Sequence, residues 1–96
     1  MHVVVNHLHF RDAVTDTIAE ATRDALRLVI DAGGIAARVV KVDDRHLILL
    51  LDFNSAEDAD RAAREVGGTW MREHIVPLLS AGTERSVGEV IASAPA

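Results

Sequence analysis

Two rows of side chains alternate along the first ten residues, which is the period of a β-strand. One row holds Val4, Asn6, Leu8 and Phe10, and the other holds Val3, Val5, His7 and His9. Successive side chains of a strand point to opposite faces of its sheet. From Val14 to Ala32, apolar residues recur every three or four positions, and Gly33–Gly34 then supplies a helix stop. The chain is therefore predicted to begin with a strand and a helix.

The remaining elements follow from the same patterns. Residues 35–42 and 46–53 are rich in strand-forming side chains, and the polar turn at 43–45 joins them into a hairpin. Ser55, with Asp58 three residues later, resembles a capping box and begins an alanine-lined helix that is expected to end at Gly67–Gly68. A further helical run covers residues 70–79, and Pro77 should kink or shorten it because proline has no N–H to donate. Residues 85–92 form the last strand, so the order is βαββαβ.

This order is typical of a ferredoxin-like α+β fold, a four-stranded antiparallel sheet with both helices on one face. Strand 46–53 is nevertheless apolar on both faces, with Leu47, Leu49, Leu51 and Phe53 in one row and Ile48 and Leu50 in the other. Such a strand is normally covered on both sides. Together with Val3 and Val5, the second row forms an apolar patch that favours association. We therefore expect a homodimer through the sheet faces, which is the dimeric α+β barrel arrangement.

Composition and charge narrow the class of protein. The 96 residues are 49% hydrophobic and 26% charged, which predicts a single globular domain over residues 1–96 with one modest core. A formal charge of −5, with arginines interleaved among acidic residues, argues against nucleic acid as a partner. The first ten residues form neither a signal-peptide core nor a membrane span, and the absence of cysteine excludes thiolate catalysis. We expect a cytoplasmic protein with no membrane partner.

Three side chains could carry chemistry. Asn6 interrupts an apolar row, and leaving its amide unsatisfied there costs about 1–3 kcal/mol, so it bonds neighbouring backbone or faces a cavity. Trp70 and His74 are four residues apart and share one edge of an apolar helical stripe. Together they could close a pocket, with His74 as a base or a ligand. The alternative is a core-edge tryptophan and a surface histidine.

A cavity between the sheet and the helices would be mostly apolar. The alanine-lined helix either packs closely on the sheet or leaves room for a ligand. In the second case Asn6, His74 and Trp70 are the candidate catalytic residues. The candidate substrate-binding residues are apolar: Leu8, Phe10, Leu49, Leu51, Met71, Ile75 and Leu78. This profile suits a small hydrophobic or aromatic molecule.

His7 and His9 lie two residues apart on one strand face, a spacing that can present two imidazoles to a metal ion. A third ligand is not adjacent in the sequence, although His46 and Asp52 share a row of the neighbouring strand. We assign no metal site on this basis. The histidines are expected to line the polar part of the interface between two sheets.

Asn6 in the first strand, the run TWMREHIVPLL over residues 69–79 and the closing ERSVGEVIAS resemble the antibiotic-biosynthesis-monooxygenase-like proteins. These proteins are dimeric α+β barrels, so the resemblance implies the same fold along nearly the whole chain. It also implies a monooxygenase that needs no cofactor and acts on a phenol whose anion reacts directly with dioxygen. In that branch Asn6 and Trp70 would hold the phenol.

The same superfamily contains haem-degrading monooxygenases, so the resemblance makes haem the alternative cofactor. These members use an asparagine of the first strand, a tryptophan and an axial helix histidine, and the positions of Asn6 and His74 suggest the first and the last of these. Trp70 departs from the pattern, because it precedes His74 by four residues and the haem-degrading members place it more than two helical turns ahead. A non-catalytic module that binds a small ligand or another protein is the third hypothesis.

Overall fold

The computed structural model describes residues 1–95, so only Ala96 of the domain expected over residues 1–96 lies outside it. The strands are β1 (His2–His9), β2 (Ala36–Asp43), β3 (His46–Phe53) and β4 (Glu84–Glu89). The helical elements are α1 (Asp16–Asp31), α2 (Ala56–Ala62), the π-helix η1 (Ala63–Met71), α3 (Arg72–His74) and the 3₁₀ turn η2 (Val76–Leu78). This sequence of elements confirms the predicted βαββαβ order.

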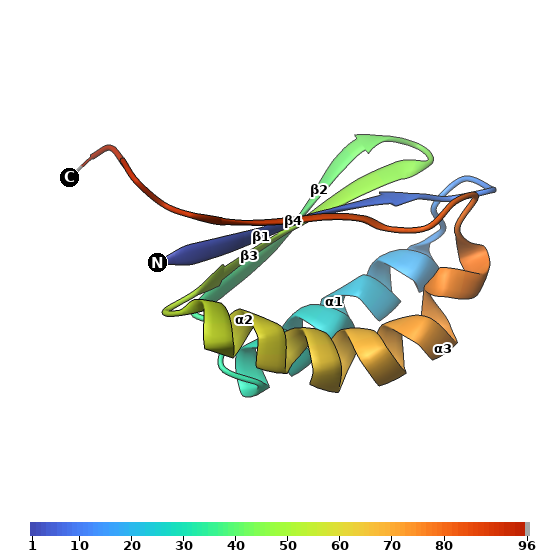
Figure 1. The fold of residues 1–96 in the computed structure, drawn as a ribbon. Helices are drawn as coiled ribbons and strands as arrows, with labels where there is room; N and C mark the ends of the chain where they lie inside the picture. The colour runs from blue at the N-terminus through green and yellow to red at the C-terminus, as the bar shows by residue number, and fades with distance from the viewer. Residues whose placement is uncertain (96) are drawn as a thin grey trace.

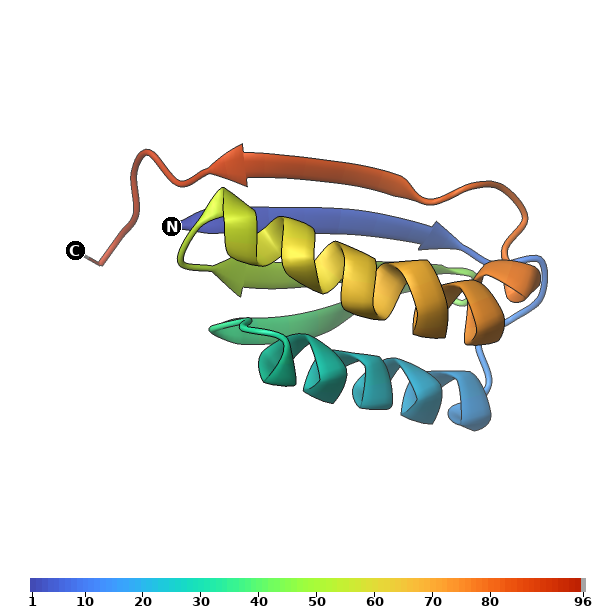
Figure 2. The same ribbon diagram turned by 60° about the horizontal axis from the view of Figure 1, so that its bottom comes forward.

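The strands form one antiparallel sheet in the order β2-β3-β1-β4. Both helical segments cover the same face of this sheet (Figure 1) and run side by side across it (Figure 2). The fold is therefore ferredoxin-like α+β, as predicted. Among residues 1–95, no helix is long and apolar enough to cross a membrane.

The hydrophobic core lies between the sheet and the helices. The inner row of β3 is buried throughout, and Phe53, Leu8 of β1 and Ile75 after α3 are the largest fully buried side chains. The outer rows of β1 and β3 are only partly buried. The alternation in the sequence thus correctly assigns the side chains of these strands to an inner and an outer face of the sheet.

Helix α1 has local signals at both ends. The Thr15 hydroxyl oxygen accepts a hydrogen bond from the Ile18 N–H at 3.3 Å, which caps the first turn. At the other end, Gly33 N–H donates to the Ile30 carbonyl and Gly34 N–H donates to the Val29 carbonyl, the bonding pattern of a Schellman motif. Gly33 has φ +110°, a conformation that L side chains rarely adopt.

The prediction that Gly67–Gly68 ends the second helix is wrong. The helix continues through both glycines as η1, a π-helix, in which Thr69 donates its hydroxyl proton to the Glu65 carbonyl at 2.8 Å. Buried Val66 and Met71 anchor the segment on either side of the glycines. Tertiary packing therefore outweighs the weak helix propensity of glycine.

The helical run expected over residues 70–79 is shortened, as Pro77 predicts. The α-helical part stops at His74, and Pro77 lies within the first turn of the short η2. The last strand ends at Glu89, three residues earlier than predicted. Beyond it, the Val90 N–H donates to the Met1 carbonyl at 2.9 Å and so extends the pairing with β1.

Replacing Gly33 by alanine should lower the free energy of unfolding. The positive φ costs a side-chain-bearing residue about 1–2 kcal/mol, and the new Cβ would lie 2.7 Å from Arg61 Nη2. Chemical denaturation measures the change. The matched control is Gly82→Ala, because a Cβ at Gly82 meets no atom within 4 Å. Equal stability of the two variants would contradict the role assigned to Gly33.

Candidate functional site

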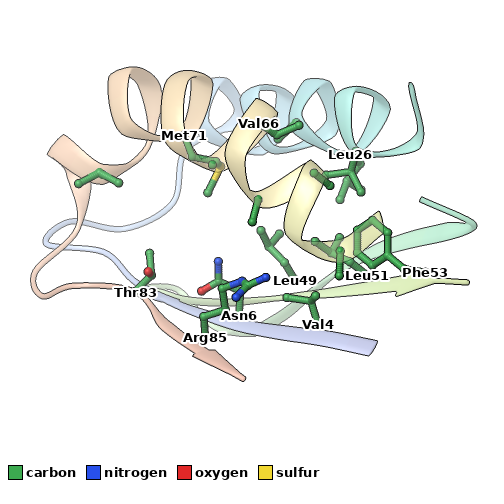
Figure 3. Close-up of a pocket in the computed structure, with 17 residues that line it drawn as sticks. Val4, Asn6, Leu26, Leu49, Leu51, Phe53, Val66, Met71, Thr83 and Arg85 are labelled. Carbon is green, nitrogen blue, oxygen red and sulfur yellow. The ribbon is translucent and has the colours of Figure 1, made fainter. Parts of the chain in front are cut away.

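A cavity of about 240 Å³ lies between the inner face of the sheet and the two helical segments (Figure 3). Its floor is apolar and comes from β1 and β3, with Val4, Leu49, Leu51 and Phe53. Leu26 and Val29 of α1 close one side. The cavity is therefore bounded by the same elements that build the core.

The opposite wall is made of small residues. Ala59, Ala62, Ala63 and Gly67 line the cavity from α2 and η1. Ala59 and Ala62 are buried, so their short side chains face the interior between the helix and the sheet. This settles the question that the alanine pattern left open, because the small residues leave room beneath the helix instead of bringing it onto the sheet.

Asn6 is the polar group on the floor of this cavity. It lies in β1, which is paired on both sides, so the alternation of the strand fixes the direction of its side chain. Its Oδ1 is buried and has no hydrogen-bond partner within the described chain. A buried acceptor without a partner is uncommon in folded proteins and is costly. Here the acceptor belongs to a residue on a cavity wall (Figure 3).

Arg85 and Thr83 complete the polar end of the cavity, and neither was predicted. Arg85 of β4 is directly opposite Asn6 in the β1–β4 pairing, and its side chain lies beside Asn6 in Figure 3. Arg85, Thr83 and Val76 are exposed residues on the wall, so the cavity reaches solvent along the β4 edge. Arg85 shares a row with Val87 in the alternation of residues 85–92, so the sequence could have placed it on the inner face. That it lies opposite Asn6 follows only from the register between β1 and β4.

The predicted site residues separate into two groups. Asn6, Leu49, Leu51 and Met71 lie together on the cavity wall. The other apolar candidates do not line it: Leu8, Phe10 and Ile75 are buried elsewhere in the core, and Leu78 is 37% exposed.

Trp70 and His74 lie close to each other and outside the lining of the cavity. Their ring centroids are 4.9 Å apart. Trp70 packs against the edge of the core, His74 is exposed, and neither lines the cavity. The structure therefore brings Asn6 together with Arg85 and does not bring it together with His74.

This arrangement can hold a flat apolar molecule with one oxygen at its end. The Asn6 amide can accept a hydrogen bond from a hydroxyl through Oδ1 and donate one to an oxyanion through Nδ2. The adjacent guanidinium of Arg85 favours the anionic form of a bound hydroxyl. None of the residues that line the cavity is a histidine or a carboxylate. The site is thus equipped to stabilise an anion, without a side-chain base on its wall.

Comparison with known proteins finds the fold at low sequence identity. No protein-family model and no curated protein matches the sequence. SnoaB, a cofactor-independent oxygenase from Streptomyces nogalater, matches with a TM-score of 0.82 and 11% identity over 99% of this chain and 97% of its own. An antibiotic biosynthesis monooxygenase matches with a TM-score of 0.80 and 12% identity over 96% of this chain and 100% of its own.

A third solved structure is a variant of MhuD with two manganese protoporphyrin IX molecules bound per active site. It matches with a TM-score of 0.70 and 14% identity over 97% of each chain. The chain therefore has the fold of the antibiotic-biosynthesis-monooxygenase-like proteins, as the sequence resemblance predicted.

Asn6→Leu should raise the free energy of unfolding by about 1–2 kcal/mol, because it removes a buried unpaired acceptor and fills apolar space. Thermal or chemical denaturation measures the change. The control is Asn54→Leu, which alters an exposed asparagine and should change stability by less than about 0.5 kcal/mol. Destabilisation of Asn6→Leu would instead mean that the amide is satisfied in the folded protein.

Proposed function

We propose that this chain, whose fold is that of the antibiotic-biosynthesis-monooxygenase-like proteins, oxidises a small aromatic phenol with dioxygen and without a cofactor. The observation that carries the proposal is the unpaired, buried Oδ1 of Asn6 on the floor of an apolar cavity, with Arg85 beside it. A retained unsatisfied polar group calls for a functional explanation. A ligand hydroxyl is the partner that this geometry fits.

The cavity volume limits the substrate. An apolar cavity of about 150 Å³ accepts benzene, and the present one has about 240 Å³. A substituted single ring or two fused rings therefore fit within it. Because the β4 edge is open, a substituent on the ring could extend past Thr83 into solvent.

The proposed reaction begins with ionisation of the bound phenol. Arg85 and the Asn6 amide stabilise the phenolate, and its proton leaves to water at the open rim. The electron-rich phenolate transfers an electron to dioxygen, and the resulting species combine to form a C–O bond at a ring carbon that carries hydrogen. The O–O bond then breaks, so that phenol and O₂ give a quinone and water. The ring carbon gives up its proton as the O–O bond breaks, so that one oxygen atom stays on the ring as a carbonyl and the other leaves as water. The substrate supplies all four electrons that reduce O₂.

Haem is the alternative cofactor, and MhuD is the reason to consider it. A haem iron needs an axial ligand that faces the cavity, and His74 is exposed and not on the wall. The residues present therefore do not fit a haem in this cavity. A Soret shift on adding hemin that is lost in His74→Ala would support this alternative.

The second face of the sheet supports a homodimer. Val3, Val5, Ile48 and Leu50 form a half-buried patch there, next to Val40, which is 41% exposed. None of the described helices covers this face. A second copy presents the same apolar patch, and a two-fold axis lets each chain cover the other and close the assembly. We therefore propose pairing through the sheet faces.

Oxygen uptake with a panel of one- and two-ring phenols tests the proposed reaction. We expect activity with at least one of them, and a fall in kcat of about 100-fold in Asn6→Ala and in Arg85→Gln because each removes a group that stabilises the oxyanion. Arg38→Gln, on the uncovered face, is the matched control and should retain activity.

Binding measured by ligand-observed NMR separates the remaining hypotheses. Binding that depends on Asn6 without oxygen uptake would favour the non-catalytic module. No binding of any phenol would contradict the proposed function.

Leu50→Arg should convert the dimer into a monomer, because it places a charge at the centre of the apolar patch. Light scattering coupled to gel filtration measures the mass. Ile30→Arg is the control, since Ile30 is an apolar residue of α1 that is 44% exposed. A monomeric wild type, or a dimer that survives Leu50→Arg, would contradict pairing through this face.

A further inference from the structure

Three histidines converge on the uncovered face of the sheet, on the side opposite the cavity. His9 of β1 and His46 of β3 are directly opposite each other in the strand pairing, and His7 lies two residues before His9. Their candidate ligand nitrogens all lie within 4.8 Å of one another. His7 Nδ1 and His46 Nε2 are 2.9 Å apart, and the rings of His9 and His46 stack with centroids 4.2 Å apart.

A carboxylate adjoins this cluster. Glu84 of β4 is opposite His7 in the β1–β4 pairing, and its Oε1 lies 3.6 Å from His9 Nε2. Carboxylates next to ligating histidines orient the imidazole rings and raise their basicity, or coordinate the metal themselves. Three strands thus contribute to one group of side chains.

We propose that His7, His9 and His46 bind one divalent transition-metal ion per chain, with zinc as the best-suited ion. Three imidazoles at about 2.0–2.1 Å from a tetrahedral zinc lie about 3.3 Å from one another. The observed separations, from 2.9 Å to at most 4.8 Å, bracket this value. We infer that rotation of these half-buried side chains brings their nitrogens to the separation that zinc requires.

The donor set decides the class of ion. Nitrogen ligands suit zinc, copper and nickel, whereas calcium and magnesium prefer oxygen ligands. Three histidines leave a fourth position for Glu84 or water, which is the ligand number of an open zinc site. The cluster and the cavity lie on opposite faces of β1, so this inference does not rest on the proposed function.

Zinc binding should stabilise the pairing of β1 with β3. An ion held by residues of both strands binds the folded chain and not the unfolded one, so it raises the melting temperature. The three histidines lie at the border of the apolar patch, because Val3, Val5 and Leu50 are further along the same two strands. The patch does not include the metal ligands, so we expect the metal-free chain to dimerise as well.

Isothermal titration of the tag-free, chelator-stripped chain with Zn²⁺ tests the site. We expect saturation at one ion per chain and a rise in melting temperature. In histidine-detected NMR the rings of His7, His9 and His46 should shift, and those of His2 and His74 should not. Equal shifts of all five histidines, or one ion per two chains, would overturn the proposed site.

Variants identify the ligands. Because loss of an outer partner alone costs 10–100-fold in metal affinity, His7→Gln and His46→Gln should each weaken zinc binding by about 100-fold or more. Glu84→Gln should weaken it by about tenfold. The control His74→Gln should leave affinity unchanged.

Circular dichroism and the melting temperature without zinc establish that each variant is folded. Should His46→Gln fail to fold, His7→Gln decides the outcome, because His7 lies on the same face and its substitution removes one imidazole. A folded His7→Gln or His46→Gln with wild-type zinc affinity would refute the site.

Discussion

The pairing of β1 with β3 is the constraint on which the molecule depends. These are the two central strands, and each is hydrogen-bonded on both sides. Because both edges of β1 are occupied, its side chains cannot rotate to the other face. Asn6 is therefore held on the inner face and His7 on the outer face, although they are neighbours in the chain.

The two faces of the sheet differ in what covers them, because both helical segments lie on the inner face. On the inner face, helices with small residues leave space above an otherwise continuous apolar floor, and a single amide with a nearby guanidinium forms the polar end of that space. On the outer face, an apolar patch next to three imidazoles lies without a cover of its own among the described elements. In our proposals, a second chain covers the apolar patch, and a metal ion binds the three imidazoles.

The sequence predicted what depends on local period and capping. The alternation of β1 assigned Asn6 to the inside, and Ser55 accepts a hydrogen bond from Asp58 N–H as a cap should. The prediction of a helix end at Gly67–Gly68 is wrong because the buried side chains of Val66 and Met71, and not helix propensity, keep that segment helical. Arg85 beside Asn6 and His46 beside His7 arise from strand register between distant segments, which a single sequence does not reveal.

The position of Trp70 and His74 has a related cause. Their expected direction assumed 3.6 residues per turn throughout, but the preceding residues form a π-helix with a wider turn. Each residue of such a segment shifts the phase of those that follow. Trp70 and His74 do share a face, with ring centroids 4.9 Å apart, but neither of them lines the cavity.

Gly67 has a consequence for how this fold can diversify. It is the one glycine among the residues that line the cavity, and a Cβ added there would meet no atom within 4 Å, so the fold can accept a side chain at this position without displacing the core. The range of ring sizes that the cavity admits could thus change through one position while the packing that holds the sheet to its helices stays the same.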